Sequence, residues 1–291
     1  MIIDGSTVNR FTGIPANGTP ITSSSFNAPA GSKLIVCAGS DSVAGTSVTL
    51  TVSGGGLSWV REVQQLPPAT FGGQSEIWSA DVSSLTNLSV SLSRTGSGST
   101  NRLSAKVYIV TGQAVSPLGN ETGGTSTTEN LTTSSLTTTG TNSAVFASAV
   151  DWAASGNGSV NPSSSDMTAD PASYNTQIDV LSGYKTVASA GSTTVNLNAA
   201  GTPASAQWVY ALLEIKDGVG TLEQSAFRFR NDDGSETTAT WAAAENTNAT
   251  IPNNTLKRLR TILNATGDLT GIQYQVEYSV NDGPWRRLRG Y

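Results

Sequence analysis

The chain has 291 residues, of which 37% are hydrophobic and only 13% are charged, and it contains six Trp but no His. Disordered chains combine low hydrophobicity with high net charge, so this composition excludes them and favours a folded protein with a sizeable core. A formal net charge of −5 disfavours nucleic-acid binding, and the lack of His excludes Ser-His-Asp and Cys-His catalysis and almost every catalytic zinc site.

Short strand-like runs follow one another from the N-terminus, separated by turns rich in Gly, Ser and Asn. Thr and Val favour strands, and the 30 Gly and 11 Pro supply turns, so an all-β fold is predicted. The first run holds the single cysteine, Cys37, which cannot form an internal disulfide. Its apolar neighbours predict a buried strand in which Cys37 is a small hydrophobe. The runs before Gly218 are residues 34–38, 47–52, 88–92, 103–110, 144–150, 194–197 and 208–215.

The apolar positions of this region repeat. Val90, Leu92, Val107 and Val110 map onto Val195, Leu197, Leu212 and Ile215 at a shift of 105 residues. Nearer the start, Phe26, Leu34 and Asp41 map onto Leu136, Ala144 and Asp151 at a shift of 110. Solenoid and propeller units run about 20–50 residues, so the repeat indicates two similar halves of a sandwich fold instead.

We therefore predict a jelly-roll-like β-sandwich over residues 1–217, with repeat halves at about 1–112 and 113–217. Two tandem small sandwiches are the alternative. A single sandwich is preferred because the link from Gly112 to Asn130 contains no long charged or Pro-rich spacer.

A second domain is predicted over residues 219–291, because the charge density changes at Gly218. There are 8 basic and 13 acidic residues before this glycine and 8 of each after it. Residues 226–230 alternate, turn at 231–234 and resume from 236 to 241, which predicts a β-hairpin. Further runs at 256–263, 272–280 and 285–288 complete the pattern of a small Ig-like β-sandwich.

Several stretches resemble known modules. In the first domain they are GLSWV (56–60), EIWSA (76–80), KVYIVTG (106–112), SGY (182–184) and WVYALLEI (208–215). These stretches resemble a jelly-roll module of tailed-bacteriophage virion structural proteins. The C-terminal stretches AFRFRNDDGSETTATW (226–241) and QYQVEYS (273–279) resemble a second module of such proteins. The resemblance implies membership of the virion and leaves head decoration, fibre and tail roles open.

Catalysis without His would use two carboxylates, as in glycosidases. The candidates are Glu76, Asp81, Asp151, Asp166, Asp170 and Asp179, which lie among turn-forming Ser and Asn, and we interpret them as turn and surface residues. Asp232, Asp233 and Glu236 carry oxygen ligands that suit calcium, but their spacing is not that of an EF-hand loop. The chain is therefore predicted to be no enzyme, with no catalytic residue, metal or cofactor.

Most Trp side chains adjoin apolar runs and are expected to pack in a core. Trp152 is the exception, because it precedes the Gly156-Asn157-Gly158 loop, and Trp152 and Asn157 are candidate glycan contacts. A basic set near the C-terminus is a candidate surface for docking on the particle, with a solvated strand face as the alternative. This set comprises Arg258, Arg260, Arg286, Arg287 and Arg289.

The expected function is that of a non-enzymatic structural protein on a phage particle, as a head decoration or fibre protein. The alternative is a tail-tip carbohydrate-binding adhesin that contacts a host-surface glycan through sandwich loops. Expected partners are other capsid or tail proteins and further copies of the chain, without nucleic acid or membrane insertion. The N-terminal MIIDGSTVNR lacks a secretory-signal pattern. We therefore expect synthesis in the host cytoplasm and localisation on the virion surface.

Overall fold

The structure is a computed structural model that describes residues 1–83, 87–96, 101–152, 163–174, 178–198, 206–218, 221–235, 237–266, 277–278 and 286–287. The chain divides into two compact units, Met1–Gly218 (unit 1) and Val219–Tyr291 (unit 2). Within the described ranges every regular element is a β-strand, which confirms the predicted all-β fold. No helix long and apolar enough to span a membrane occurs in these ranges.

The first half of unit 1 contains a large antiparallel sheet and two smaller ones. The large sheet has the order β1-β11-β5-β8-β7, and β2 also pairs with β11. Its strands are β1 (Ile2–Asp4), β2 (Phe11–Gly13), β5 (Lys33–Ser40), β7 (Val60–Gln65), β8 (Gln74–Asp81) and β11 (Leu103–Thr111). The smaller sheets contain β3 (Ile21–Thr22), β10 (Ser91–Thr95) and β6 (Thr49–Ser53), and β4 (Phe26–Asn27) with β9 (Asn87–Leu88).

The second half repeats this arrangement. Its large sheet has the order β12-β20-β15-β17-β16. These strands are β12 (Gln113–Ser126), β15 (Ser143–Asp151), β16 (Thr168–Tyr174), β17 (Ile178–Val187) and β20 (Trp208–Asp217). Two short ladders accompany the sheet, β13 (Asn130–Thr132) with β19 (Asn196–Asn198) and β14 (Leu136–Thr138) with β18 (Gly191–Thr193).

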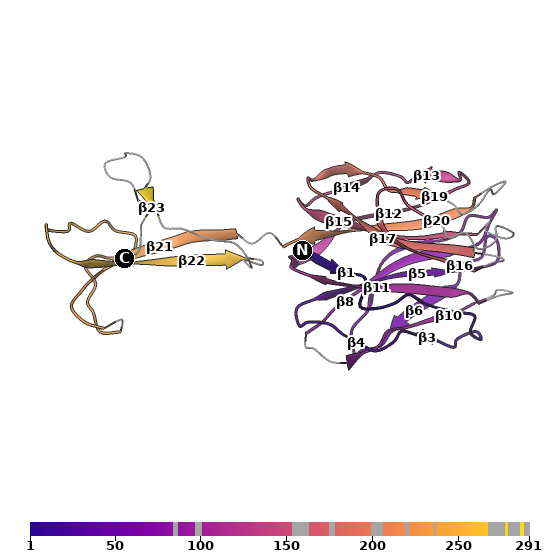
Figure 1. Cartoon of the computed structure of the whole chain (residues 1–291), viewed down its shortest axis with the longest axis horizontal. Coiled ribbons are helices and arrows are strands. Elements are labelled where there is room, and N and C mark those ends of the chain that lie inside the picture. Colours follow the sequence, from indigo (N-terminus) through magenta and orange to yellow (C-terminus); the bar gives the residue numbers. More distant parts are fainter. Residues whose placement is uncertain are drawn as a thin grey trace. The chain divides into compact units, whose positions relative to one another are not determined.

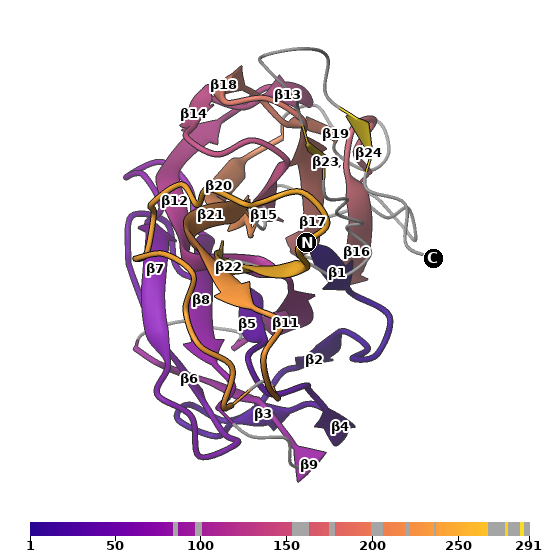
Figure 2. The same cartoon turned by 90° about the vertical axis from the view of Figure 1, so that its left-hand side faces the viewer.

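The sheets of unit 1 stack in layers, with the two large sheets in the middle (Figures 1 and 2). One apolar cluster fills the first half, another fills the second half, and a third joins the facing large sheets. In the described residues no ladder joins strands of different halves. The two halves form one compact unit while each large sheet keeps its own strands, so the preference for a single sandwich and the alternative of two tandem sandwiches both stay predictions.

The central strands explain why the two large sheets face each other. All eight residues of β5 and all nine of β15 are buried, so both faces of each large sheet are covered. On β5, Leu34 and Val36 face the core of their own half, whereas Ile35 and Cys37 face the other half. A continuous apolar run of this kind is typical of a strand that is buried on both faces.

The structure confirms the shift of 105 residues and corrects part of the shift of 110. Val36 lies opposite Val107 on β11, and Ala147 lies opposite Leu212 on β20, so β5 and β15 correspond at a shift of 111. Leu34 thus corresponds to Val145 and not to Ala144, which faces the other half. Side chains point alternately to the two faces of a sheet, so one extra residue before β15 moves each predicted residue of this strand to the opposite face.

In unit 2, β21 (Thr221–Asn231) pairs with β22 (Lys257–Thr266), and β23 (Glu277–Tyr278) pairs with β24 (Arg286–Arg287). The prediction that residues 226–230 pair with residues 236–241 in a hairpin is wrong, because β21 pairs with β22 instead. In the described residues the segment up to Trp241 contributes a single bridge to β21, between Arg230 and Trp241. The Asp233 carboxylate accepts hydrogen bonds from the Thr240 amide (2.9 Å) and hydroxyl (2.5 Å), which hold this segment as a loop. The jelly-roll and Ig-like assignments stay predictions.

Candidate functional site

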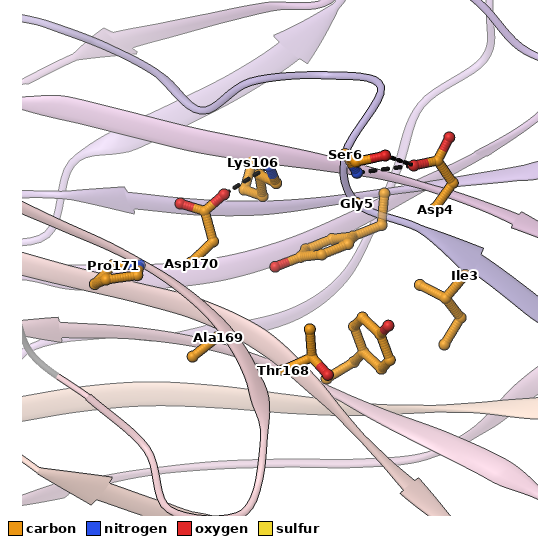
Figure 3. A pocket seen from close by; sticks show the side chains of 11 residues that line it. Ile3, Asp4, Gly5, Ser6, Lys106, Thr168, Ala169, Asp170 and Pro171 are labelled. Carbon is orange, nitrogen blue, oxygen red and sulfur yellow. Dashed lines mark hydrogen bonds and ion pairs between the residues drawn. The ribbon is translucent and has the colours of Figure 1, made fainter.

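The two halves of unit 1 border a cleft of about 490 Å³. One wall comes from β1 and the turn that follows it, and the other comes from the outer strand β16 (Figure 3). Lys106 and Tyr108 of β11 and Tyr184 of β17 complete the lining. The cleft exists because β1 and β16 each lie at an edge of one of the two large sheets that stack face to face.

An ion-pair cluster lies along the cleft at Asp170. Its carboxylate pairs with Lys106 Nζ (2.6 Å) and with Arg10 Nε (3.0 Å), and Figure 3 shows the Lys106 pair. Lys106 also donates a hydrogen bond to the Val8 carbonyl oxygen (2.9 Å), and Arg10 donates one to the Ser104 hydroxyl (2.7 Å). Burial raises the pKa of Asp170, but the two cations lower it by more, so this pKa lies below its usual range. Asp170 is therefore ionised at neutral pH.

A second carboxylate, that of Asp4, lies on the opposite wall (Figure 3). It accepts hydrogen bonds from the Ser6 amide (2.8 Å), the Ser6 hydroxyl (2.8 Å) and the Thr7 amide (3.1 Å), and from the Thr7 hydroxyl. The Thr7 hydroxyl bond makes the largest contribution to a pKa lowered to about 2. Asp4 is thus ionised at neutral pH, and its hydrogen bonds fix the turn beside the cleft.

Aromatic rings form the inner part of the cleft. Tyr108 contacts Phe146 and Tyr184 edge to face, with centroids 5.3 Å and 5.9 Å apart. Tyr108 is only 2% exposed, and its hydroxyl has no hydrogen-bond partner among the described residues. Burial raises the pKa of this phenol well above its usual range, so the hydroxyl is protonated. No described residue uses this donor and acceptor.

Gly5 lies in the turn after β1, directly against the Tyr108 ring. A Cβ atom at position 5 would lie 2.9 Å from Tyr108 Cε1, closer than real Cβ contacts. Glycine therefore allows the turn after β1 to pass directly over the Tyr108 ring.

The comparisons with known proteins identify no relative. No protein-family model matches the chain, and no curated protein or solved structure matches it significantly.

The chemistry of the cleft suits binding better than acid catalysis. A glycosidase needs one carboxyl group that stays protonated to donate its proton, whereas Asp4 and Asp170 both have lowered pKa values. Glu76 has a raised pKa, caused mainly by burial, but its side chain is fully buried and bonded to Trp78 Nε1 (2.7 Å) and Gln74 Nε2 (2.6 Å). No group of metal-ligating side chains occurs within the described ranges.

The other carboxylates weighed from the sequence are spread through unit 1. Asp151 and Asp179 lie directly opposite each other in the β15–β17 ladder and are buried. Asp166 pairs with Lys185 (2.9 Å), and the exposed Asp81 pairs with Lys33 (2.7 Å). The structure thus brings together one pair of these candidates, away from the cleft lining.

Trp152, one of the two candidate glycan contacts, is not among the described residues that line the cleft. Trp152 is half-buried and packs against Val150, Ile178 and Val180. Its indole Nε1 would lie 2.7 Å from a Cβ atom at Gly72, so the ring covers this glycine. Asn157 lies outside the described residues. The role of the pair in glycan binding stays a prediction.

The basic set is distributed over two ladders of unit 2. Arg258 and Arg260 lie on β22, where Arg258 pairs with Asp232 (2.6 Å) and Arg260 lies opposite Arg228. The backbones of Arg286 and Arg287 form β24, and Arg289 lies outside the described residues. A further feature of this unit is the exposed Trp241, which was expected in a core but stacks with the guanidinium of Arg228 (4.1 Å) and of Arg230 (4.8 Å).

Sequence reasoning missed Lys106, Tyr108 and Tyr184 as site residues, although they belong to the stretches KVYIVTG and SGY. Lys106 and Tyr108 interrupt a run of β11 that is otherwise apolar or small, and both are buried, whereas Tyr184 lies where β17 becomes partly exposed. A lysine in a buried strand needs a charged or hydrogen-bonding partner, so Lys106 was the available signal. Its partner Asp170 lies 64 positions away and was not predictable from spacing.

Proposed function

We propose that the chain is a non-enzymatic structural protein displayed on a phage particle, as a head decoration or fibre protein. Its partners are other capsid or tail proteins and further copies of itself, and it is located on the virion surface. The proposal builds on the resemblance of the stretches 56–60, 76–80 and 226–241 to virion modules. Two compact units suit this role, because one can hold the particle while the other projects.

The observation that carries the proposal is that two buried carboxylates, those of Glu214 and Asp41, hold the backbone of unit 1 together. Glu214 on β20 accepts hydrogen bonds from the amides of Thr139 and Gly140 (2.9 Å each) and from the Ser143 hydroxyl (2.8 Å). Asp41 accepts one from the Arg102 amide (3.1 Å) and pairs with the Arg102 and Arg94 guanidinium groups. Charges used in this way stabilise a scaffold and are not available to a substrate.

Particle membership is tested on purified virions of the phage that encodes the chain. Mass spectrometry is expected to detect the chain, and cryo-microscopy is expected to show density of the size of unit 1 on the outer surface. Absence of the chain from washed particles would overturn the proposal.

The tail-tip adhesin remains a second candidate function, and the cleft of unit 1 favours it, because recognition of a sugar needs aromatic and hydrogen-bonding groups in one concave site. Copy number separates the two functions. A decoration protein is present in tens to hundreds of copies in each particle, whereas an adhesin at the tail tip is present in few.

A further inference from the structure

We propose that the cleft between β1 and β16 binds a neutral sugar, with the Tyr108 hydroxyl as one of its hydrogen-bonding groups. The inference rests on the adhesin alternative for its biological use, but the binding itself is a property of unit 1. A volume of about 490 Å³ lies within the range of roughly 300–1,000 Å³ that is usual for small-molecule sites.

The Tyr108 hydroxyl is the first argument. A buried polar group without a partner is unfavourable, and native proteins rarely keep one without a function. Tyr210 shows the ordinary alternative, because its hydroxyl accepts a hydrogen bond from the Ser134 amide (2.9 Å) and contacts the Ser134 hydroxyl (3.0 Å). The Tyr108 side chain lines the cleft, and its hydroxyl is buried. A ligand hydroxyl that enters as far as this group would supply the partner that the described residues do not.

The charge balance of the cleft is the second argument. Asp4 and Asp170 line it with Lys106, and Arg10 binds Asp170 from outside the lining. The four formal charges cancel, so the site has no net attraction for a phosphate or an ammonium group. A ligand with many hydroxyl groups can donate to the carboxylates and accept from Lys106, because each hydroxyl is both donor and acceptor.

The aromatic lining is the third argument. Tyr108 and Tyr184 provide apolar ring surface beside these polar groups. A sugar ring presents C–H groups on its faces and hydroxyls on its rim, so it matches a site with both kinds of surface.

The test uses the purified full chain on an array of neutral and charged glycans, followed by titration calorimetry with the neutral glycan that gives the strongest signal. We expect saturable binding that Tyr108→Phe weakens about tenfold, the effect of losing one hydrogen bond. Gly5→Ala is expected to weaken binding at least as much, because the added methyl group displaces the Tyr108 ring.

Tyr210→Phe is the matched control. It removes a hydroxyl that bonds to Ser134 in the second half, so it is expected to lower the urea midpoint and leave glycan affinity unchanged. Tyr108→Phe is expected to weaken glycan binding and leave the urea midpoint unchanged, because the Tyr108 hydroxyl has no partner among the described residues.

Three outcomes overturn the proposal: no neutral glycan binds, charged glycans alone bind, or Tyr108→Phe and Gly5→Ala both bind as tightly as the unaltered chain. Particle membership is measured separately on virions. A chain that binds sugar but is absent from particles contradicts the proposed function alone, and a chain present in particles without sugar binding contradicts this inference alone.

Discussion

The hydroxyl of Ser148 donates a hydrogen bond to the carbonyl oxygen of Ala38 (3.0 Å), and this bond crosses from the second half of unit 1 to the first. A second hydrogen bond between the halves runs from the Ser75 hydroxyl to the Ser148 carbonyl oxygen (2.7 Å). Next to Ala38, Gly39 has no side chain, and a Cβ atom there would lie 2.8 Å from Val150 Cγ2. Small residues thus allow the two large sheets to approach closely at this point.

Gly39→Val is expected to lower the free energy of unfolding by about 1–3 kcal/mol, because added atoms in a packed interior force the neighbouring side chains to move. Urea unfolding followed by Trp fluorescence measures the change. Thr51→Val, on the exposed face of β6, is the control and is expected to change stability by less than about 0.5 kcal/mol. Equal midpoints for Gly39→Val and the unaltered chain would show that the sheets do not meet here.

Glu214→Gln is expected to lower the free energy of unfolding by about 2 kcal/mol at pH 7, because the buried site loses a charged acceptor. Burial raises the pKa of Glu214, but hydrogen bonds led by the Gly140 amide lower it by more, so it lies below its usual range. The stabilisation is therefore present above the unfolded-state pKa of about 4.3 and is lost as the pH falls through the lower folded-state value.

The measurement for Glu214 is the difference in urea midpoint between the two proteins at pH 7 and at pH 3. A difference that does not shrink at pH 3 would contradict the charge-based explanation. Asp81→Asn is the control, since Asp81 is 80% exposed in its pair with Lys33 and an exposed pair contributes less than about 1 kcal/mol.

The Cys37 thiol is expected to be unreactive in the folded protein. It is fully buried between the two large sheets, and burial raises its pKa to about 12, so almost no thiolate forms at neutral pH. A chromogenic disulfide reagent should label it slowly in buffer and rapidly in concentrated urea. The chain has one cysteine, so the signal is unambiguous, and rapid labelling in buffer would contradict the packing of β5.

Limited proteolysis with a protease of broad specificity is expected to cut first between Asp217 and Thr221. The two units are each compact, and the sequence between them contains Gly218 and Gly220. The resulting N-terminal fragment should unfold cooperatively in urea. First cuts within β20 would show that the boundary lies elsewhere.

Much of the fold was predictable from local patterns. The runs 34–38, 103–110 and 208–215 are strands β5, β11 and β20, because a short apolar run bounded by turn residues has few other solutions. The shift of 105 residues is also confirmed, since residues of the first half that face its core map onto residues of the second half that face the corresponding core. The assignment of Leu34 to Ala144 failed because the sequence shows no marker for a single added residue in a turn.

Local sequence patterns and composition were sufficient to assign the all-β class, to locate most strands and to exclude His-dependent chemistry. The tertiary structure decided what covers the second face of β5 and β15, and it placed Asp4, Lys106 and Asp170 around one cleft. The difference lies in how far apart in the sequence the interacting residues are. Strand formation follows from neighbouring residues, whereas the stacking of two sheets depends on side chains that meet only after both sheets have formed.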